Sequence, residues 1–255
     1  MTGPVRALFT DLDGTMTTGG RVEAETYSLL ETLGAAGIPV IIVTGRPAGW
    51  GQAIATMCPV AALVAENGGV TFVWEGKNGE RKLKKRYGVP AAMLPDWRRR
   101  MHAAVVDAMA DVPGARLSTD SRYREVDLAV DWNEEASLSR EDAEHVVSSL
   151  KSQGFSAVRS SVHVNFGPPE LSKLTACKTV VERVLNGDPE DLSPYVFVGD
   201  ALNDATMFAG FPRSVGVANI RRWWDELAHK PRFVTESEEG RGLREVCHHI
   251  LAHTV

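Results

Sequence analysis

The sequence predicts an α/β fold: a Rossmann-like parallel-sheet core with an α+β domain inserted into it. Short apolar runs alternate with stretches of helical apolar spacing near the start of the chain, and the same alternation returns near its end. Between them the pattern changes to hairpin-like and longer helical segments. Short strand–helix units pair in parallel through right-handed crossovers, so the two outer parts are expected to share one sheet. We expect a discontinuous core at 1–80 and 168–255, and the inserted domain at 81–167.

The core elements follow from apolar patterning. Apolar runs closed by polar residues or glycine are typical of strands buried on both faces, and they lie at 5–11, 38–46 and 60–69. Helical spacing predicts a helix at 22–38, with Gly37 as its C-cap, and another at 48–57. After the insertion we expect a helix at 171–185, a strand at 193–200, a short helix at 201–211, a strand at 213–219 and an amphipathic helix at 242–253.

The inserted part has a different rhythm. It is preceded by "VTFVWEGKNGERKLKKR", residues 70–86, which is typical of a hairpin turning at Lys77-Asn78-Gly79. The next predicted elements are a helix at 94–112 stopped by Pro113-Gly114, a strand at 125–132, a helix at 139–155 capped by Ser139 or Asp142, and a strand at 162–166. Mixed strands and helices of this kind indicate an α+β unit.

Bulk composition excludes several classes of protein. The chain has 255 residues, 44% hydrophobic and 24% charged, with a formal net charge of −5, which is the balance of a globular protein and not of a nucleic-acid or anionic-membrane binder. The first residues lack the apolar core of a signal peptide, and no apolar stretch reaches the length of a membrane span. Cys58, Cys177 and Cys247 are widely spaced and are expected to be reduced, so we expect a cytoplasmic protein.

Four polar clusters follow predicted core strands. They are Asp11-Leu12-Asp13-Gly14-Thr15, Thr44-Gly45-Arg46, Glu66-Asn67-Gly68-Gly69 and the segment from Gly199 to Asp204. In an open parallel sheet, ligands collect outside the carboxyl ends of the strands. The clusters are therefore expected to converge at one edge of the sheet.

These clusters resemble the motifs of haloacid dehalogenase-type phosphatases over essentially the whole chain. "DLDGT" at 11–15 is similar to the first motif, "IIVTGR" at 41–46 to the second and "VGDALND" at 198–204 to the fourth. Lys173 stands where the third motif places its lysine, but Leu174 follows it where relatives usually have glycine, so Lys178 remains an alternative. An insertion between the second and third motifs resembles the class of Cof-like, sucrose-phosphate, trehalose-phosphate and mannosyl-phosphoglycerate phosphatases. The resemblance implies that 81–167 is a cap domain that selects the substrate.

The acidic residues are candidates for a metal site. A phosphate dianion repels an attacking carboxylate, so a cation must lie between them, and Mg²⁺ prefers oxygen ligands. Asp11 and Asp200 are the expected side-chain ligands, with the Asp13 backbone carbonyl as a third. Asp204 is expected to ligate through water or to orient Asp200.

The same loops supply candidates for catalysis. The resemblance implies that Asp11 is the nucleophile that forms an aspartyl-phosphate, and that Asp13 protonates the leaving oxygen and later activates water. Thr44, Lys173 and backbone N–H groups near Gly45 are expected to bind the phosphate oxygens. Arg46 and Asn203 are further candidates for substrate binding.

Several residues keep two interpretations. An EF-hand starting at Asp11 is excluded, because its twelfth position is Val22 where a bidentate Glu is required. Glu66-Asn67-Gly68 is either a turn or a substrate contact. His163 and Asn165 share a face of one strand and either contact the substrate or are packed in the domain. The basic stretch at 77–100 is either a solvated face or a positive rim that attracts an anionic substrate.

The sequence thus predicts a Mg²⁺-dependent phosphatase acting on a small phosphorylated metabolite of the sugar-phosphate type, with neither nucleic acid nor membrane as a partner. A phosphomannomutase-type phosphotransferase shares the core and the position of the cap, and it is the alternative enzyme. A phosphosugar-binding protein without catalysis is the non-enzymatic alternative. The sequence does not predict the oligomeric state.

Overall fold

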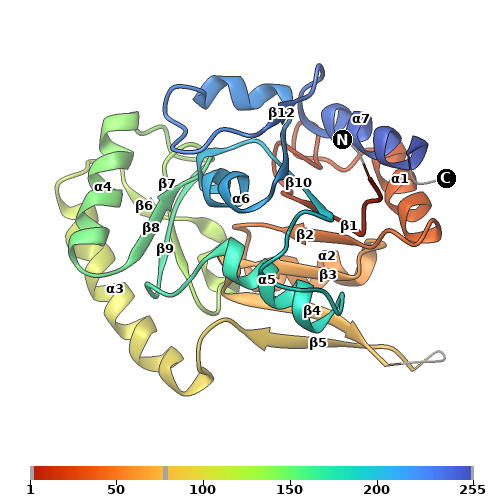
Figure 1. Cartoon of the computed structure of the whole chain (residues 1–255). Helices are drawn as coiled ribbons and strands as arrows, with labels where there is room; N and C mark the ends of the chain where they lie inside the picture. The colour runs from red at the N-terminus through yellow and green to blue at the C-terminus, as the bar shows by residue number, and fades with distance from the viewer. Residues whose placement is uncertain (1–2, 77–79, 254–255) are drawn as a thin grey trace.

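The computed structural model describes residues 3–76 and 80–253. Within them the chain forms an eight-stranded sheet and a separate four-stranded sheet, each covered by helices (Figure 1). None of the described helices is long and apolar enough to cross a lipid bilayer. The three cysteine thiols are unpaired, as expected.

The main sheet has the strand order β12-β11-β10-β1-β2-β3-β4-β5. Its six strands from β12 to β3 are parallel, and β4 and β5 are added antiparallel at one edge. This confirms the predicted α/β fold with a parallel-dominated core. The strands are β1 (Ala7–Thr10), β2 (Val40–Val43), β3 (Ala62–Ala65), β4 (Val70–Glu75), β5 (Lys82–Tyr87), β10 (Tyr195–Gly199), β11 (Arg213–Gly216) and β12 (Phe233–Val234).

Helices cover both faces of this sheet, which explains why its parallel strands are continuous apolar runs. Alternate strand residues point to opposite faces, so Phe9 packs in the cluster under α5 and α6, while Leu8 packs with α1, α2 and α7. These helices are α1 (Ala24–Ala35), α2 (Ala48–Met57), α5 (Lys173–Arg183), α6 (Ala205–Gly210) and α7 (Glu239–Ala252). Figure 1 shows α1 and α7 side by side near the C-terminus.

The second sheet is antiparallel and lies beside the carboxyl ends of the core strands. Its order is β6-β7-β9-β8, formed by β6 (Arg116–Leu117), β7 (Leu128–Asp131), β8 (Ser156–Arg159) and β9 (His163–Gly167). Two helices, α3 (Leu94–Ala110) and α4 (Arg140–Ser152), pack on it and on each other. The expected cap of α4 is confirmed, because Ser139 and Asp142 form a capping box.

Short 3₁₀ helices connect several elements. They are η1 (Glu66–Gly68), η2 (Ala91–Met93), η3 (Thr119–Tyr123), η4 (Leu202–Asp204) and η5 (Ala218–Trp223). The predicted short helix at 201–211 is therefore a 3₁₀ turn followed by α6, and the predicted strand at 213–219 ends at Gly216.

The structure differs from the expected division at residue 80. β5 pairs with β4 along its whole length, so the chain leaves the main sheet only after Tyr87. The residues of the expected hairpin turn, 77–79, lie outside the described residues. We propose that the inserted domain starts after Tyr87 and that its end at Gly167 is as expected from the sequence. Strands β6, β8 and β12 were not predicted.

Candidate active site

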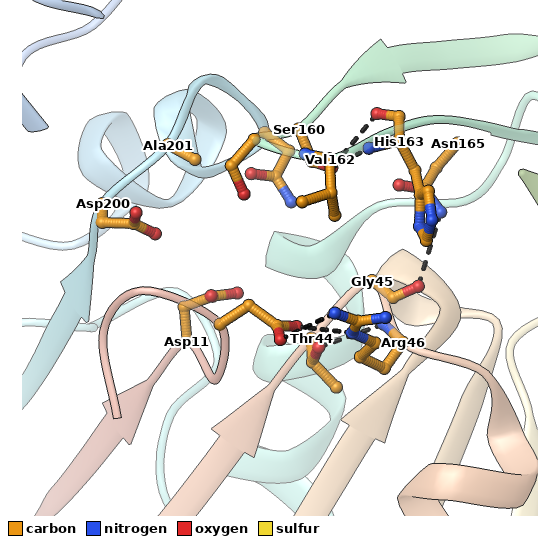
Figure 2. A pocket seen from close by; sticks show the side chains of 13 residues that line it. Asp11, Thr44, Gly45, Arg46, Ser160, Val162, His163, Asn165, Asp200 and Ala201 are labelled. Carbon is orange, nitrogen blue, oxygen red and sulfur yellow. Dashed lines mark hydrogen bonds and ion pairs between the residues drawn. The ribbon is translucent and has the colours of Figure 1, made fainter. Parts of the chain in front are cut away.

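Three loops from the carboxyl ends of neighbouring parallel strands meet in one place. Asp11 follows β1, Thr44 follows β2 and Asp200 follows β10, and β1 lies between the other two strands. These residues line a pocket that opens onto about 330 Å³ of space, with the core on one side and the inserted domain on the other (Figure 2). The structure therefore brings the predicted loops together, as expected for ligand sites in open parallel sheets.

Three buried carboxylates form the deepest part of the site. Oxygen atoms of Asp11, Asp200 and Asp204 lie within 4.8 Å of one another. Burial, opposed by the charge of Lys173, raises the pKa of Asp11 to about 7. Burial and the neighbouring carboxylates raise the pKa of Asp200 well above its usual range. The cluster holds more negative charge than its surroundings balance, which is the electrostatic setting of a cation site.

Lys173 is the cation inside this cluster. Its Nζ lies 2.7 Å from Asp11 Oδ1 and 2.8 Å from Asp204 Oδ1. Burial alone would lower the pKa of Lys173, but the charges of the two carboxylates outweigh it and raise the pKa. The Ser172 hydroxyl caps α5 by accepting a hydrogen bond from the Thr175 N–H, so the helix begins at Lys173.

Lys178, the alternative third-motif lysine, lies elsewhere. Its Nζ is 2.7 Å from Glu190 Oε2 in a pair with an exposed carboxylate. Of the two lysines, the structure places Lys173 against the predicted nucleophile.

Asp204 fixes the loop that carries Asp200. Its Oδ2 accepts the N–H of Asp200 at 3.1 Å and the N–H of Ala201 at 3.3 Å, while its Oδ1 accepts from Lys173. Both oxygens of Asp204 therefore have protein donors. This favours the orienting role over direct ligation of a metal.

Asp200 is held from two further loops. Thr15 Oγ1 donates to Asp200 Oδ1 at 3.3 Å, and Asn219 Nδ2 donates to Asp200 Oδ2 at 2.8 Å and to the Gly14 carbonyl at 2.9 Å. Gly14 has φ +71°, and a Cβ there would lie 2.6 Å from Asp200 Oδ2, so the loop requires glycine. Sequence reasoning missed Asn219, because it is the last residue of a predicted core strand and lies outside every motif.

The donor set fits a hard divalent cation. Asp11 and Asp200 are buried oxygen ligands that approach each other closely, and a dianionic pair at this distance requires positive charge. The ligation by the Asp13 carbonyl stays a prediction. Asp11 and Asp200 would hold the ion, with Asp204, Thr15 and Asn219 orienting them.

Asp13 is paired with Arg46. Arg46 Nε and Nη2 donate to the two carboxylate oxygens of Asp13 at 2.9 and 3.0 Å, in a bidentate pair between the first and second motif loops. The guanidinium also lies over the Trp50 ring, 4.9 Å from its centroid. Burial would lower the pKa of Arg46, but Asp13 and a further carboxylate, Glu134, outweigh it and raise the pKa. Arg46 was predicted to bind substrate, and in this structure its guanidinium is paired with the Asp13 carboxylate.

The second motif loop faces the inserted domain. The Thr44 hydroxyl is buried, lines the pocket and accepts the Arg46 N–H at 3.0 Å. The Gly45 carbonyl accepts from Asn165 Nδ2 at 3.4 Å (Figure 2). It also accepts from Arg124 Nη1 at 3.0 Å. The inserted domain therefore contacts the core at the loop that is expected to bind phosphate.

The inserted domain closes the pocket with residues near β9. His163 and Asn165 both line it, as their shared strand face predicts, and Asn203 lines it from the core. Sequence reasoning missed the turn between β8 and β9, because nothing in its sequence marks it as a site. Its lining residues are Ser160, Ser161 and Val162.

Glu134 is a further residue that sequence reasoning missed. Its Oε1 lies 2.9 Å from Arg46 Nη2, and its Oε2 lies 2.8 Å from His163 Nε2. Contact with His163, followed by pairing with Arg46, lowers the pKa of Glu134 to about 2 against the effect of burial. The carboxylate thus connects a core residue of the pocket with one from the inserted domain.

Glu66 has a structural role. Its side chain is fully buried and accepts four backbone N–H bonds, from Ala48 at the start of α2 and from Glu125, Val126 and Asp127 before β7. Of the two interpretations of Glu66-Asn67-Gly68, the structure shows the turn, and Glu66 joins the core to the inserted domain.

The described part of the basic stretch, residues 80–100, includes β5, η2 and the first part of α3. Lys85 pairs with Glu125 at 2.7 Å, and Arg86 pairs with Glu75. None of its described residues is among those that line the pocket. A role in attracting substrate stays a prediction.

Comparisons with known proteins agree with this site. The family of haloacid dehalogenase-like hydrolases matches residues 8–86, which carry the first two motif loops. The chain is 29% identical over 219 residues to a phosphoglycolate phosphatase of Halorubrum lacusprofundi, covering 84% of this chain and 85% of that protein. It is 28% identical over 249 residues to a phosphoglycolate phosphatase of Archaeoglobus fulgidus, covering 94% of each.

Solved structures share the whole fold. A Thermoplasma acidophilum protein superposes with a TM-score of 0.74 at 18% identity, covering 98% of this chain and 99% of that one. The sucrose-phosphatase of Synechocystis, solved with sucrose and phosphate, superposes with a TM-score of 0.69 at 16% identity, covering 97% and 98%. The motif loops, their convergence and these similarities agree: the chain is similar to the haloacid dehalogenase-like hydrolases, as its sequence predicts, and the agreement supports a phosphoric monoester hydrolase.

Proposed function

We propose that the protein is a Mg²⁺-dependent phosphatase that hydrolyses a small, sugar-type phosphate monoester through an aspartyl-phosphate on Asp11. The observation that carries the proposal is the buried group of Asp11, Asp200, Asp204 and Lys173, of which Asp11 and Asp200 line a small polar pocket. Buried carboxylates clustered around one ammonium are costly for stability, so their presence in a pocket supports a functional role.

The reaction needs two steps at phosphorus. An oxygen of Asp11 attacks phosphorus and the bond to the ester oxygen breaks, while Asp13 gives a proton to that leaving oxygen. Asp13 then takes a proton from water, whose oxygen attacks the same phosphorus and releases phosphate and the free Asp11 carboxylate. A bound Mg²⁺ on Asp11 and Asp200 would offset the negative charge of carboxylate and phosphate.

Neighbouring side chains position these groups. Lys173 holds Asp11 in place at 2.7 Å and carries a positive charge beside the phosphate site. Thr44 lines the pocket and offers a hydroxyl to a phosphate oxygen. To act on the leaving group, Asp13 must release at least one of its two hydrogen bonds from Arg46.

Two substrate classes are supported by different observations. Hydroxyl-bearing sugar phosphates are favoured by the polar lining of His163, Asn165 and Ser160, and one structural relative is a sucrose-phosphatase. Phosphoglycolate is the second candidate, because the curated relatives carry that name.

The proposal is tested by measuring phosphate release from a panel of sugar phosphates, phosphorylated disaccharides and phosphoglycolate with Mg²⁺. Wild-type protein is expected to release phosphate, and Asp11→Asn to lose at least about 10³-fold in kcat with an unchanged circular dichroism spectrum. Full activity of Asp11→Asn removes Asp11 from the mechanism. Conversion of one sugar phosphate isomer to another without free phosphate identifies a phosphotransferase, and no reaction with any ester supports the non-catalytic alternative.

A further inference from the structure

Three carboxylates surround Arg46, the one arginine among the described residues that line the pocket. Asp13 binds it bidentately, Glu134 Oε1 lies 2.9 Å from its Nη2, and Asp120 Oδ2 lies 3.7 Å from its Nη1. Asp120 is also paired with the buried Arg124, at 3.2 Å, so Asp13 and Glu134 are the two carboxylates that share the charge of Arg46. The leaving-group side of the pocket carries an excess of negative charge even before a substrate enters.

Glu134 is held rigidly at this position. It lies in the loop after β7, where the buried Asp131 carboxylate accepts three backbone N–H bonds, from Glu134, Glu135 and Ala136, at 2.9–3.0 Å. Its second oxygen lies 2.8 Å from Nε2 of His163, which lines the pocket. Its lowered pKa, about 2, keeps the side chain anionic at neutral pH. The loop thus presents a fixed negative charge to two pocket-lining residues.

We propose that Glu134 is a specificity-determining residue that selects against substrates with an anionic leaving group and favours neutral, hydroxyl-bearing ones. The inference rests on the proposed phosphatase function. A substrate carboxylate reaches Arg46 or His163 only by displacing Glu134, which holds both of them. A hydroxyl group has no such penalty and can donate a hydrogen bond to the Glu134 carboxylate.

Pairs of substrates that differ only in this charge test the proposal. 2-Hydroxyethyl phosphate and 2-phosphoglycolate differ in a terminal hydroxymethyl group against a carboxylate, and glycerol 3-phosphate and 3-phosphoglycerate differ in the same way with one more carbon. For each pair, the measured quantity is kcat/KM for the neutral substrate divided by kcat/KM for the anionic substrate. For a compound that is not turned over, the inhibition constant against the best ester of the panel replaces kcat/KM.

The variant is Glu134→Gln, which removes the charge and keeps the size of the side chain. The matched control is Glu135→Gln in the same loop, which changes net charge equally. Glu135 contacts Thr119 and Arg116, whereas Arg46 and His163 contact Glu134. We expect the wild-type ratio to exceed one and Glu134→Gln to lower it by about tenfold or more, with Glu135→Gln within about twofold of wild type.

The ratio separates substrate selection from a structural role, because a loss of packing lowers kcat/KM for both substrates of a pair by the same factor. An equal ratio in wild type and Glu134→Gln, or a wild-type preference for the anionic member, overturns the proposal. In either case phosphate release from the panel still supports the proposed function. Absence of release from every ester overturns the proposed function, and the selection rule with it.

Discussion

Lys173 Nζ lies 2.7 Å from Asp11 Oδ1, although the two residues are 162 positions apart in the chain. The contact joins the first core strand to the first helix after the inserted domain. Lys173 supplies the positive charge that two of the three clustered carboxylates contact directly. The proposed catalytic centre therefore draws on segments from both ends of the chain.

Lys173→Met is expected to lower the free energy of unfolding by about 3–5 kcal/mol in metal-free buffer and to abolish phosphate release. The substitution leaves Asp11 and Asp204 buried without their cation. Urea unfolding and a phosphate-release assay measure the two effects. Lys178→Met is the matched control, and because its pair with Glu190 is partly exposed it is expected to cost less than about 1 kcal/mol. Equal effects of the two variants contradict the assignment of Lys173.

Mg²⁺ is expected to raise the melting temperature of the wild-type protein, because an ion that binds only the folded state stabilises it. At tenfold excess over its Kd the gain is about 1.4 kcal/mol, a shift of about 3–6 °C for a chain of this size. Asp200→Asn is expected to lose this shift, while the exposed Asp225→Asn keeps it. Thermal melts with Mg²⁺ and with EDTA measure the difference. An undiminished shift in Asp200→Asn removes Asp200 from the metal site.

Glu66→Gln is expected to lower the free energy of unfolding by at least about 2 kcal/mol. The carboxylate accepts four backbone N–H bonds, and an amide presents its NH₂ group to some of these donors. Faster hydrogen exchange at Glu125, Val126 and Asp127 is expected alongside the loss. Glu75→Gln, which breaks an exposed pair with Arg86, is the comparison and is expected to cost under about 1 kcal/mol. Unchanged exchange at the three amides counts against the role of Glu66 in joining the two domains.

Acid is expected to remove the stabilisation that Glu134 provides. The folded-state pKa of Glu134 is lowered from 4.5 to about 2, so its contribution is full above pH 4.5 and is lost as the pH falls towards 2. The free energy of unfolding of wild type should therefore exceed that of Glu134→Gln at pH 5 and above, and the difference should shrink across this window. Urea unfolding at several pH values measures it, with Glu135→Gln as the reference. A difference that is constant with pH shows that Glu134 is not held as an ion pair.

Local patterning was sufficient for five of the six parallel strands, all except β12, and for the polar residues that follow β1, β2 and β10. Asp11, Thr44 and Asp200 each follow a short apolar run, which is typical of a strand buried on both faces. Because the carboxyl ends of parallel strands lie at one edge of the sheet, the three residues are expected to converge there. The lysine of the site was predicted from the resemblance alone. Its choice over Lys178 needed the structure, because helix position alone does not show which side chain turns inward.

Other features depend on contacts between distant segments. β5 is mostly exposed and rich in lysine, as edge strands often are. Its sequence therefore lacks the alternation of apolar and polar residues that would assign it to the main sheet. Asn219 and Glu134 lie outside the motifs and reach the site only through the packing of η5 and of the inserted domain. Pairing of Asp13 with Arg46 is likewise a tertiary contact between two loops.

The central claim is a covalent bond between Asp11 and phosphorus, and reductive trapping tests it most directly. Protein quenched during turnover with Mg²⁺ and the best ester is treated with borohydride, which reduces an acyl phosphate of aspartate to homoserine. The tryptic peptide Ala7–Arg21 contains both Asp11 and Asp13, and its fragmentation locates the change. We expect homoserine at position 11 only when substrate is present. Homoserine at position 13, or none in protein that is turning over, contradicts the account.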